Sequence, residues 1–306
     1  MMFLIPVLAA NLSLPRRPAR RLGENVRLSR RVARADGPAH GARYQTARHS
    51  KEQRVVDSLG SRMKFAVVAP STNTSVEPEY AAMQPRGVTN HFSRIAIPDT
   101  KVTDDDSFMV MLNTIRDSTF DAVDVSMSMD PGCVIMGMSA ETFWDGAEGA
   151  DRLHKKMLER TGGVPVIMGS TAVDSAIKAY ESEVGAIRKI GILTPYAPVG
   201  DANVKKFFED QGYEVVHIVG LKSPSPMMIA HEDKQKLKRT AIAVSEGVDA
   251  IIQAGTNLAF AEVAAIAEFW LEKPVIAINT ATYWHALRTM GINDQMDGFG
   301  TLLSKY

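Results

Sequence analysis

Eight short runs of apolar residues follow one another through most of this 306-residue chain. Near-continuous valine, isoleucine and leucine is typical of strands buried on both faces, as in parallel sheets. Amphipathic stretches such as DANVKKFFEDQG (201–212) separate the runs and are typical of helices. The alternation predicts an α/β, doubly wound fold. The predicted strands are KFAVVAP (64–70), HFSRIAI (91–97), CVIMGM (133–138), PVIMGS (165–170), KIGILTP (189–195), EVVHIVG (214–220), DAIIQAG (249–255) and KPVIAIN (273–279).

A repeat divides this region into two halves. PVIMGSTA (165–172) and PVIAINTA (274–281) share Pro-Val-Ile and, three residues later, Thr-Ala. Each follows a small-residue turn, MGMS or AGTN. The repeat predicts two pseudo-symmetric lobes with parallel sheets, residues 63–185 and 186–306, and one active-site cleft between them. The alternative is that Pro-Val-Ile recurs only because buried strands are rich in valine and isoleucine.

Residues 1–62 differ in composition from the rest. The first 50 residues contain ten arginines against two acidic residues, Glu24 and Asp36. We interpret 1–62 as a disordered, Arg-rich N-terminal extension. A targeting segment and an upstream translation start are both open readings, the second because Met63 opens a natural first strand of a cytoplasmic domain.

Overall composition excludes several functional classes. The formal net charge is zero, so neither nucleic acid nor a membrane surface is an expected partner. One cysteine, Cys133, rules out a disulfide within the chain. The seven histidines are scattered without ligand spacing, so we expect no metal site.

Small and polar residues follow four of the predicted strands. In α/β proteins such strand ends meet beside helix N-termini, where unpaired N–H groups favour a carboxylate or phosphate. The residues are Ser71, Thr72, Asn73 and Thr74 in PSTNTSVE, Gly137 and Ser139 in MGMS, Thr194 and Tyr196 in TPY, and Gly255, Thr256 and Asn257 in AGTN.

Structural roles compete with these functional ones. Thr74 and Glu77 fit a helix capping box, and Ser139 and Thr256 could be plain caps. Tyr196 could be a packing residue. The run Asp104–Asp106 is typical of a solvated helix start. Cys133 precedes its strand at the end away from the cleft.

Together the motifs PSTNTSVEPE, MGMSAETF, ILTPY, DAIIQAGTNL and PVIAINTATYWHALR resemble the aspartate/glutamate racemase superfamily over residues 63 to 291. The maleate cis-trans isomerase and arylmalonate decarboxylase branches are most similar. The resemblance implies two lobes that hold a small carboxylic acid between them, no cofactor, and a homo-oligomer. It also implies one reactive cysteine in each lobe for racemases and isomerases, and one in the second lobe for decarboxylases.

Carried over position by position, the two cysteine sites fall on Gly137 and Gly255. Asn73 and Tyr196 match carboxylate-binding residues, and Ser139 matches an oxyanion-holding hydroxyl. Met138 stands where a threonine is expected. A further expected asparagine falls near Pro226.

The sequence therefore predicts a cofactor-independent isomerase or decarboxylase-like enzyme acting on a small (di)carboxylic acid. Tyr196 and Ser139 are the expected catalytic residues, with the carboxylate or enediolate held by hydroxyls and turn amides. Met136, Met138 and Phe143 would form an apolar wall. The expected substrate-binding residues are Asn73, Gly137, Met138, Gly255, Thr256 and Asn257. One alternative is a non-catalytic dicarboxylate-binding protein, because glycine supplies no acid or base. Another is a hydrolase or hydratase with a water in the space left by two facing glycines.

Overall fold

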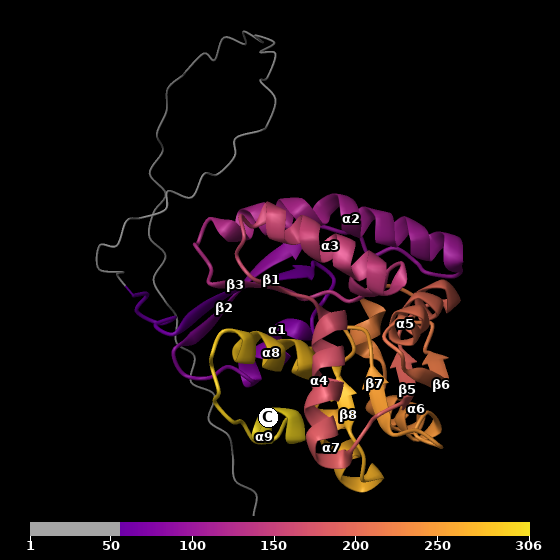
Figure 1. Cartoon of the computed structure of the whole chain (residues 1–306). Helices are drawn as coiled ribbons and strands as arrows, with labels where there is room; N and C mark the ends of the chain where they lie inside the picture. Colours follow the sequence, from indigo (N-terminus) through magenta and orange to yellow (C-terminus); the bar gives the residue numbers. More distant parts are fainter. Residues whose placement is uncertain (1–55) are drawn as a thin grey trace, which may run out of the picture. The chain divides into compact units, whose positions relative to one another are not determined.

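The computed structural model describes residues 56–306. Residues 1–55, which make up most of the predicted N-terminal extension, lie outside the described part. The elements below are labelled in Figure 1.

Two four-stranded sheets form the framework, and every neighbouring pair of strands is parallel. Their strand orders, β2-β1-β3-β4 and β6-β5-β7-β8, are the same when the lobes are superimposed. Each strand overlaps one predicted apolar run, so the predicted α/β fold with two parallel sheets is confirmed. The strands are β1 (Met63–Pro70), β2 (Val88–Ile95), β3 (Cys133–Met136), β4 (Val166–Ile167), β5 (Lys189–Thr194), β6 (Glu214–Gly220), β7 (Ala250–Gln253) and β8 (Val275–Ala277).

Helices cover both sheets (Figure 1). The long helix α2 begins where the acidic run predicted, because the Asp104 side chain accepts a hydrogen bond from the Ser107 N–H in a capping box. The helices are α1 (Val76–Ala82), α2 (Asp105–Met127), η1 (Ala140–Phe143), α3 (Gly146–Arg160), α4 (Gly169–Val184), α5 (Pro198–Asp210), η2 (Met228–His231), α6 (Lys234–Ala243), α7 (Ala261–Leu271), α8 (Ile278–Thr289) and α9 (Thr301–Lys305), where η marks a 3₁₀ helix.

The last helix of each repeat packs across the boundary between the lobes. Helix α8 contacts α1, β3 and β4 of the first lobe, and α4 contacts β8 of the second. At the crossing of α4 and α8, Gly169 faces Ile278 closely enough that a Cβ at 169 would lie 2.9 Å from the Ile278 Cδ1. One hydrophobic core consequently contains residues of both sheets, such as Phe65 and Ile252. The predicted boundary near residue 185 falls in the connection between α4 and β5.

Helix α1 is capped differently from the sequence prediction. The Ser75 side chain makes no capping bond, and Glu77 pairs with Arg94 instead of closing a capping box. Asn73 Oδ1 accepts hydrogen bonds from the N–H groups of Ser75 and Val76, both at 3.0 Å. Asn73 lies at the exit of β1, two residues before the N-cap Ser75. Its short side chain therefore caps the helix in place of the predicted capping box.

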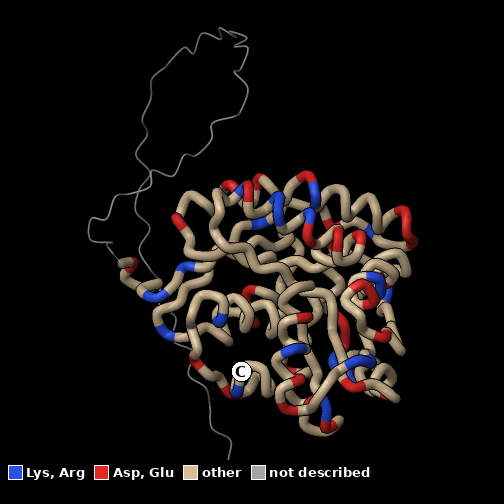
Figure 2. Tube along the Cα trace, viewed as in Figure 1, with Lys and Arg blue, Asp and Glu red and all other residues tan. Residues whose placement is uncertain are grey.

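Charges of both signs are interspersed along the outer helices (Figure 2). Acidic residues outnumber basic ones within residues 56–306, because the net charge of zero includes the Arg-rich start of the chain. Among residues 56–306, no helix combines the length and apolar character needed to cross a bilayer.

Candidate active site

A small cavity lies where the carboxyl ends of β1, β3, β5 and β7 meet. Its volume is about 60 Å³. Its lining residues are Pro70, Thr72, Asn73, Ile97, Met111, Ile115, Met138, Ser139, Ala140, Pro195, Tyr196, Pro226, Ile229, Gly255, Thr256 and Asn257.

Four predicted residues form a hydrogen-bonded chain across the lobes. Ser139 Oγ lies 2.6 Å from the Tyr196 hydroxyl and accepts from Thr256 N–H at 3.0 Å. Asn73 Nδ2 donates to Thr256 Oγ1 at 3.2 Å. All four side chains are at least nine-tenths buried. The tertiary structure therefore brings together residues that are up to 183 positions apart in sequence.

The Ser139–Tyr196 pair keeps one hydroxyl proton for a ligand. Either oxygen can donate to the other, so the pair uses one of its two protons internally. Within the described residues, neither hydroxyl has another acceptor. A buried donor without an acceptor is costly, and a ligand oxygen would satisfy it.

Backbone donors add to this polar side. No acceptor within residues 56–306 takes the N–H of Met138, Ser139, Gly255 or Asn257. These residues all line the cavity, two from each lobe. Since no Asp, Glu, Lys, Arg or His lines it, the cavity offers an anion only neutral donors.

Tyr196 is held as a neutral phenol. Burial raises its pKa above the ordinary value, although the hydrogen bond with Ser139 opposes the shift. Its N–H donates to Thr194 Oγ1 at 3.0 Å, and the Thr194 hydroxyl in turn donates to Asp201. Burial raises the pKa of Asp201 to about 6. This Asp201–Thr194 pair fixes the β5–α5 turn and with it the phenol.

Asn257 acts as a bridge beneath the cavity rim. Its Oδ1 accepts from Thr74 N–H at 2.9 Å, and its Nδ2 donates to the Pro226 carbonyl at 2.8 Å. Pro226, where the resemblance implied an asparagine, does line the cavity but supplies only ring and carbonyl there.

Gly137 does not occupy its expected place. Its N–H donates to the Val68 carbonyl at 2.7 Å, so this donor is unavailable to a substrate. A Cβ at 137 would lie 3.0 Å from Ala69 Cβ and 3.1 Å from Val67 Cγ1, against the first sheet. Gly137 is absent from the cavity lining, and only its carbonyl contributes, by accepting from Thr256 Oγ1 at 3.2 Å. The prediction that the Gly137 N–H binds the substrate is therefore wrong.

Strand registers show that Gly137 and Gly255 are not structural counterparts. Val134 and Ile135 pair with the Val-Ile of the first repeat, and Ile251 and Ile252 pair with that of the second. Counting residues forward from these pairs in each lobe makes Ala254 the counterpart of Gly137. The hydrogen bonds agree, because the Ala254 N–H donates to the Leu193 carbonyl as the Gly137 N–H donates to the Val68 carbonyl.

Gly255 is the counterpart of Met138, and its backbone conformation requires glycine. It adopts φ +118°, which side-chain-bearing residues rarely adopt. A Cβ there would lie 2.6 Å from Pro195 Cγ and closer still to Cδ. A Cβ at either glycine would thus meet protein atoms. Gly255 lines the cavity and Gly137 does not, so the two glycines do not face each other across it.

The apolar wall is built from other residues than predicted, Met138 excepted. It consists of Ile97, Met111, Ile115, Met138 and Ile229. Met111 and Ile115 stand four residues apart on α2, a spacing the sequence alone cannot distinguish from ordinary core.

Two of the expected wall residues lie in the core instead. Met136 is a buried residue of β3, and Phe143 packs on Phe207 and Phe208, with ring centroids 5.2 and 5.8 Å apart.

A buried carboxylate behind the site escaped sequence analysis. Glu79 of α1 accepts from Ala261 N–H at 3.1 Å, at the start of α7, and from Asn279 Nδ2 at 2.6 Å. Asn279 Nδ2 also donates to the Thr256 carbonyl at 2.8 Å. Burial raises the pKa of Glu79 to about 7. Glu79 therefore positions the second lobe's turn from the first lobe.

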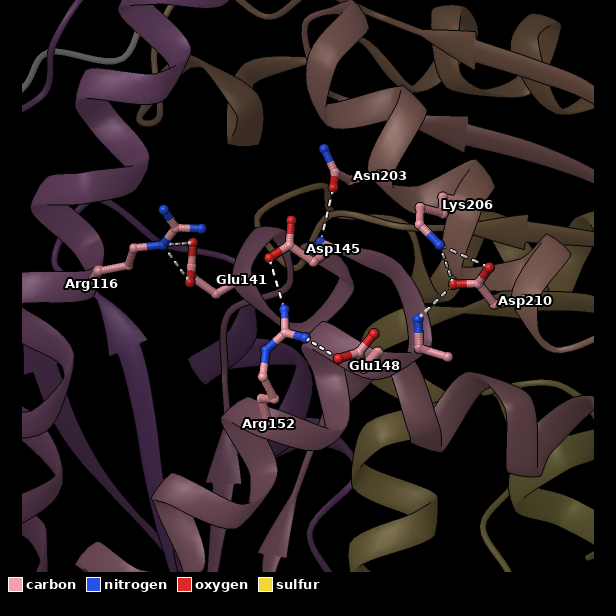
Figure 3. Close-up of polar contacts among 9 residues, drawn as sticks. Arg116, Glu141, Asp145, Glu148, Arg152, Asn203, Lys206 and Asp210 are labelled. Carbon is pink, nitrogen blue, oxygen red and sulfur yellow. Dashed lines mark hydrogen bonds and ion pairs between the residues drawn. The ribbon is translucent and has the colours of Figure 1, made fainter.

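A larger hollow of about 330 Å³ adjoins the site through Met138. Arg116 Nε lies 2.8 Å from the Glu141 carboxylate, and its guanidinium lies 5.2 Å from the Trp144 ring centroid. Arg152 pairs with Asp145 at 2.9 Å (Figure 3). Because both arginines are already paired with carboxylates, we assign these contacts to holding the segment after β3 in place.

The same segment is tied to the second lobe. Asp145 N–H donates to Asn203 Oδ1 at 2.9 Å, and Ala147 N–H donates to Asp210 at 3.0 Å (Figure 3). Both acceptors belong to α5. The rim that carries Ser139 is thus anchored on both sides.

Cys133 is buried at the start of β3, and burial raises its pKa to about 12. It does not line the cavity. In the described part of the chain, no group of three or more His, Cys, Asp or Glu side chains could hold a metal ion.

Residues 66–303 match the arylmalonate decarboxylase family. The chain belongs to this family. Among its curated relatives, the maleate isomerase of Pseudomonas putida is 24% identical over 251 residues, which cover 79% of this chain and 97% of the relative.

Solved structures agree with the fold. The Nocardia farcinica maleate cis-trans isomerase bound to TRIS superimposes with a TM-score of 0.70 at 18% identity, covering 79% of this chain and 98% of that one. A variant of the same isomerase, with a covalently bound succinylcysteine intermediate, also has a TM-score of 0.70 at 18% identity, covering 80% and 99%. An arylmalonate decarboxylase structure has a TM-score of 0.62 at 18% identity, covering 79% and 100%. These family members share the two-lobe architecture described above.

Proposed function

We propose that this family member is a cofactor-independent decarboxylase or isomerase that acts on a small (di)carboxylic acid. The observation that carries the proposal is the Ser139–Tyr196 pair, buried on the rim of a neutral cavity with one proton uncommitted. A maleate isomerase relative and the decarboxylase name of the family support the substrate class.

One carboxylate of the substrate would lie on the polar side. Two side-chain donors are available to it, the spare proton of the Ser139–Tyr196 pair and the second Asn73 amide proton. Four backbone N–H groups are also free, those of Met138, Ser139, Gly255 and Asn257. Fixed donors in a site without bulk water stabilise an enediolate more than the ground-state acid. Thr256 would position these donors, because its N–H and its hydroxyl are already hydrogen-bonded.

The second carboxylate would lie against Ile97, Met111 and Ile115. Aliphatic groups destabilise an ionised carboxylate because they cannot solvate its charge. Carbon dioxide is neutral and carries no such cost, so the wall favours its release. Loss of carbon dioxide needs no base, which suits a cavity without one.

Thiol chemistry is the point where this chain departs from its relatives. The succinylcysteine of the Nocardia enzyme requires a nucleophilic sulfur. The implied cysteine positions of this chain are Gly137 and Gly255, and Cys133 is buried away from the cavity. We infer that any reaction here runs without sulfur. Tyr196, which is protonated before the reaction, would give its hydroxyl proton to carbon, and the resulting phenolate would take a proton from water as the product leaves.

A non-catalytic dicarboxylate-binding protein is the second candidate. The absence of any charged acid or base among the lining residues favours it. A hydrolase or hydratase that uses a bound water is the third candidate. The cavity beside Gly255 would hold that water, but Gly137 does not line the cavity.

The test is to incubate the protein with maleate, methylmalonate and phenylmalonate in deuterated water and follow the carbon signals by NMR. We expect carbon dioxide release and one deuterium at the α-carbon, at a rate lowered ~100-fold or more in Tyr196→Phe. Binding without decarboxylation, isomerisation or exchange would establish the second candidate. No binding of any acid would overturn both.

A further inference from the structure

The small cavity and the larger hollow next to it meet at one residue. In the part of the chain that the structure describes, Met138 alone lines both spaces, and it is 2% exposed. The two spaces follow each other along α2, where Ile115 lines the cavity and Thr119, one helical turn later, lines the hollow. The segment after β3 has the same order, since Ala140 lines the cavity and Glu141 lines the hollow. The Met138 side chain therefore lies between two adjoining spaces.

The two spaces differ in what they can hold. The cavity has a volume of about 60 Å³ and the hollow a volume of about 330 Å³. An apolar cavity of about 150 Å³ in a protein interior binds benzene. Only the hollow exceeds that size, and its lining includes the apolar side chains of Phe120, Trp144, Leu153 and Met157. An aromatic ring on the α-carbon of a bound acid would therefore need the hollow, whereas a hydrogen atom or a methyl group would not.

We propose that Met138 is a specificity-determining residue that keeps acids with a large α-substituent out of this site. The inference rests on the proposed function, in which the acid binds between the Ser139–Tyr196 pair and the apolar wall. Met138 belongs to that wall and directly precedes Ser139, so a carboxylate held at Ser139 brings the α-carbon next to it. The chain would thus prefer small aliphatic dicarboxylic acids to arylmalonates, although the family is named for the latter.

Isothermal titration calorimetry with methylmalonate and phenylmalonate measures this preference without requiring turnover. We expect the wild-type protein to bind methylmalonate at least ~30-fold more tightly than phenylmalonate, and Met138→Ala to reduce that ratio ~10-fold or more. Met111→Ala is the matched control, because Met111 is also a buried methionine of the wall but does not line the hollow. It should change the ratio less than ~3-fold, with circular dichroism confirming the fold of each variant.

Refilling the hollow tests where the aromatic ring lies. Leu153 lines the hollow and not the cavity, so Leu153→Trp in the Met138→Ala background should restore the wild-type preference. A double variant that keeps the gain in phenylmalonate affinity would overturn the proposal. Equal wild-type affinity for the two acids, or equal effects of Met111→Ala and Met138→Ala, would also overturn it. Absence of binding by either acid in every protein would overturn the proposed function, and this inference with it.

Discussion

The turn after β3 and the turn after β7 look alike in sequence, but their glycines have different structural roles. In the first lobe, Gly137 continues the strand's hydrogen bonding and packs against the sheet. In the second lobe, Ala254 takes that place, and Gly255 lies one position later with a left-handed backbone. A glycine at the same apparent site therefore marks close packing in one lobe and an unusual backbone angle in the other.

The residues that do correspond are those that meet. Ser139 and Thr256 are counterparts by register, and Thr256 N–H donates to Ser139 Oγ across the lobe boundary. The pair differs in what remains free. Thr256 Oγ1 is committed to the Gly137 carbonyl and Asn73, whereas Ser139 shares a spare proton with Tyr196. The first lobe and Tyr196 would thus carry the chemistry, and Thr256 the geometry.

The largest expected effect tests this division of labour. Under the proposed function, Ser139→Ala and Tyr196→Phe should each lower kcat/KM ~100-fold or more, as expected for removal of one enediolate donor. Thr256→Val, which keeps the side-chain shape, should cost only ~10-fold because its hydroxyl is already paired. Steady-state kinetics on the acid turned over in the NMR assay checks both. Equal losses at 139 and 256 would mean that the lobes contribute alike.

Alanine at each glycine compares the two turns themselves. Gly255→Ala should lower the free energy of unfolding by about 3 kcal/mol, because a Cβ would combine backbone strain with a clash against Pro195. Gly137→Ala should cost about 1–2 kcal/mol, since neighbours at 3.0–3.2 Å need shift only a little. Urea denaturation measures both. The reverse order would show that Gly255 relaxes more easily than its φ suggests.

Two partly buried carboxyls, one per lobe, should make stability depend on pH. Burial raises the pKa of Glu79 from 4.5 to about 7 and that of Asp201 from 3.8 to about 6. A raised pKa stabilises the fold fully below the ordinary value, and this contribution is lost as pH rises through the folded value. The free energy of unfolding should therefore fall between about pH 4 and pH 7, by up to about 3 kcal/mol for Glu79.

Urea denaturation at several pH values separates the two groups. Glu79→Gln should flatten the curve between about pH 6 and pH 7, and Asp201→Asn should reduce its slope between about pH 4 and pH 6. If Glu79→Gln kept the wild-type slope around pH 7, the buried Glu79 carboxyl would not be its source.

The smallest effect concerns the cap of α1. Asn73→Ala should cost about 1–2 kcal/mol because it removes the acceptor of two helix N–H groups. Glu77→Ala should cost under about 0.5 kcal/mol, the value of a surface ion pair with Arg94. Thermal unfolding of the two variants distinguishes them. A larger loss at Glu77 would restore the capping box predicted from sequence.

The predictions that succeeded depend on local periodicity. Buried parallel strands are continuous apolar runs, so the strands, the repeat and the strand ends were all visible in sequence. The acidic start of α2 was visible for the same reason, because Asp104 and Ser107 are close along the chain. Several interpretations failed: the apolar wall at Met136 and Phe143, the capping box at Glu77, and the role of Gly137.

By itself the sequence determined the two α/β halves and which loops lie at the carboxyl edge of each sheet. It also determined that no sulfur nucleophile stands at Gly137 or Gly255. Only the tertiary structure decided that Ser139, Tyr196 and Thr256 meet, that Gly137 faces the sheet, and that Glu79 supports the opposite lobe. These depend on strand register and on the approach of segments 57 to 200 residues apart. Such contacts are set by packing between the lobes, which no local pattern encodes.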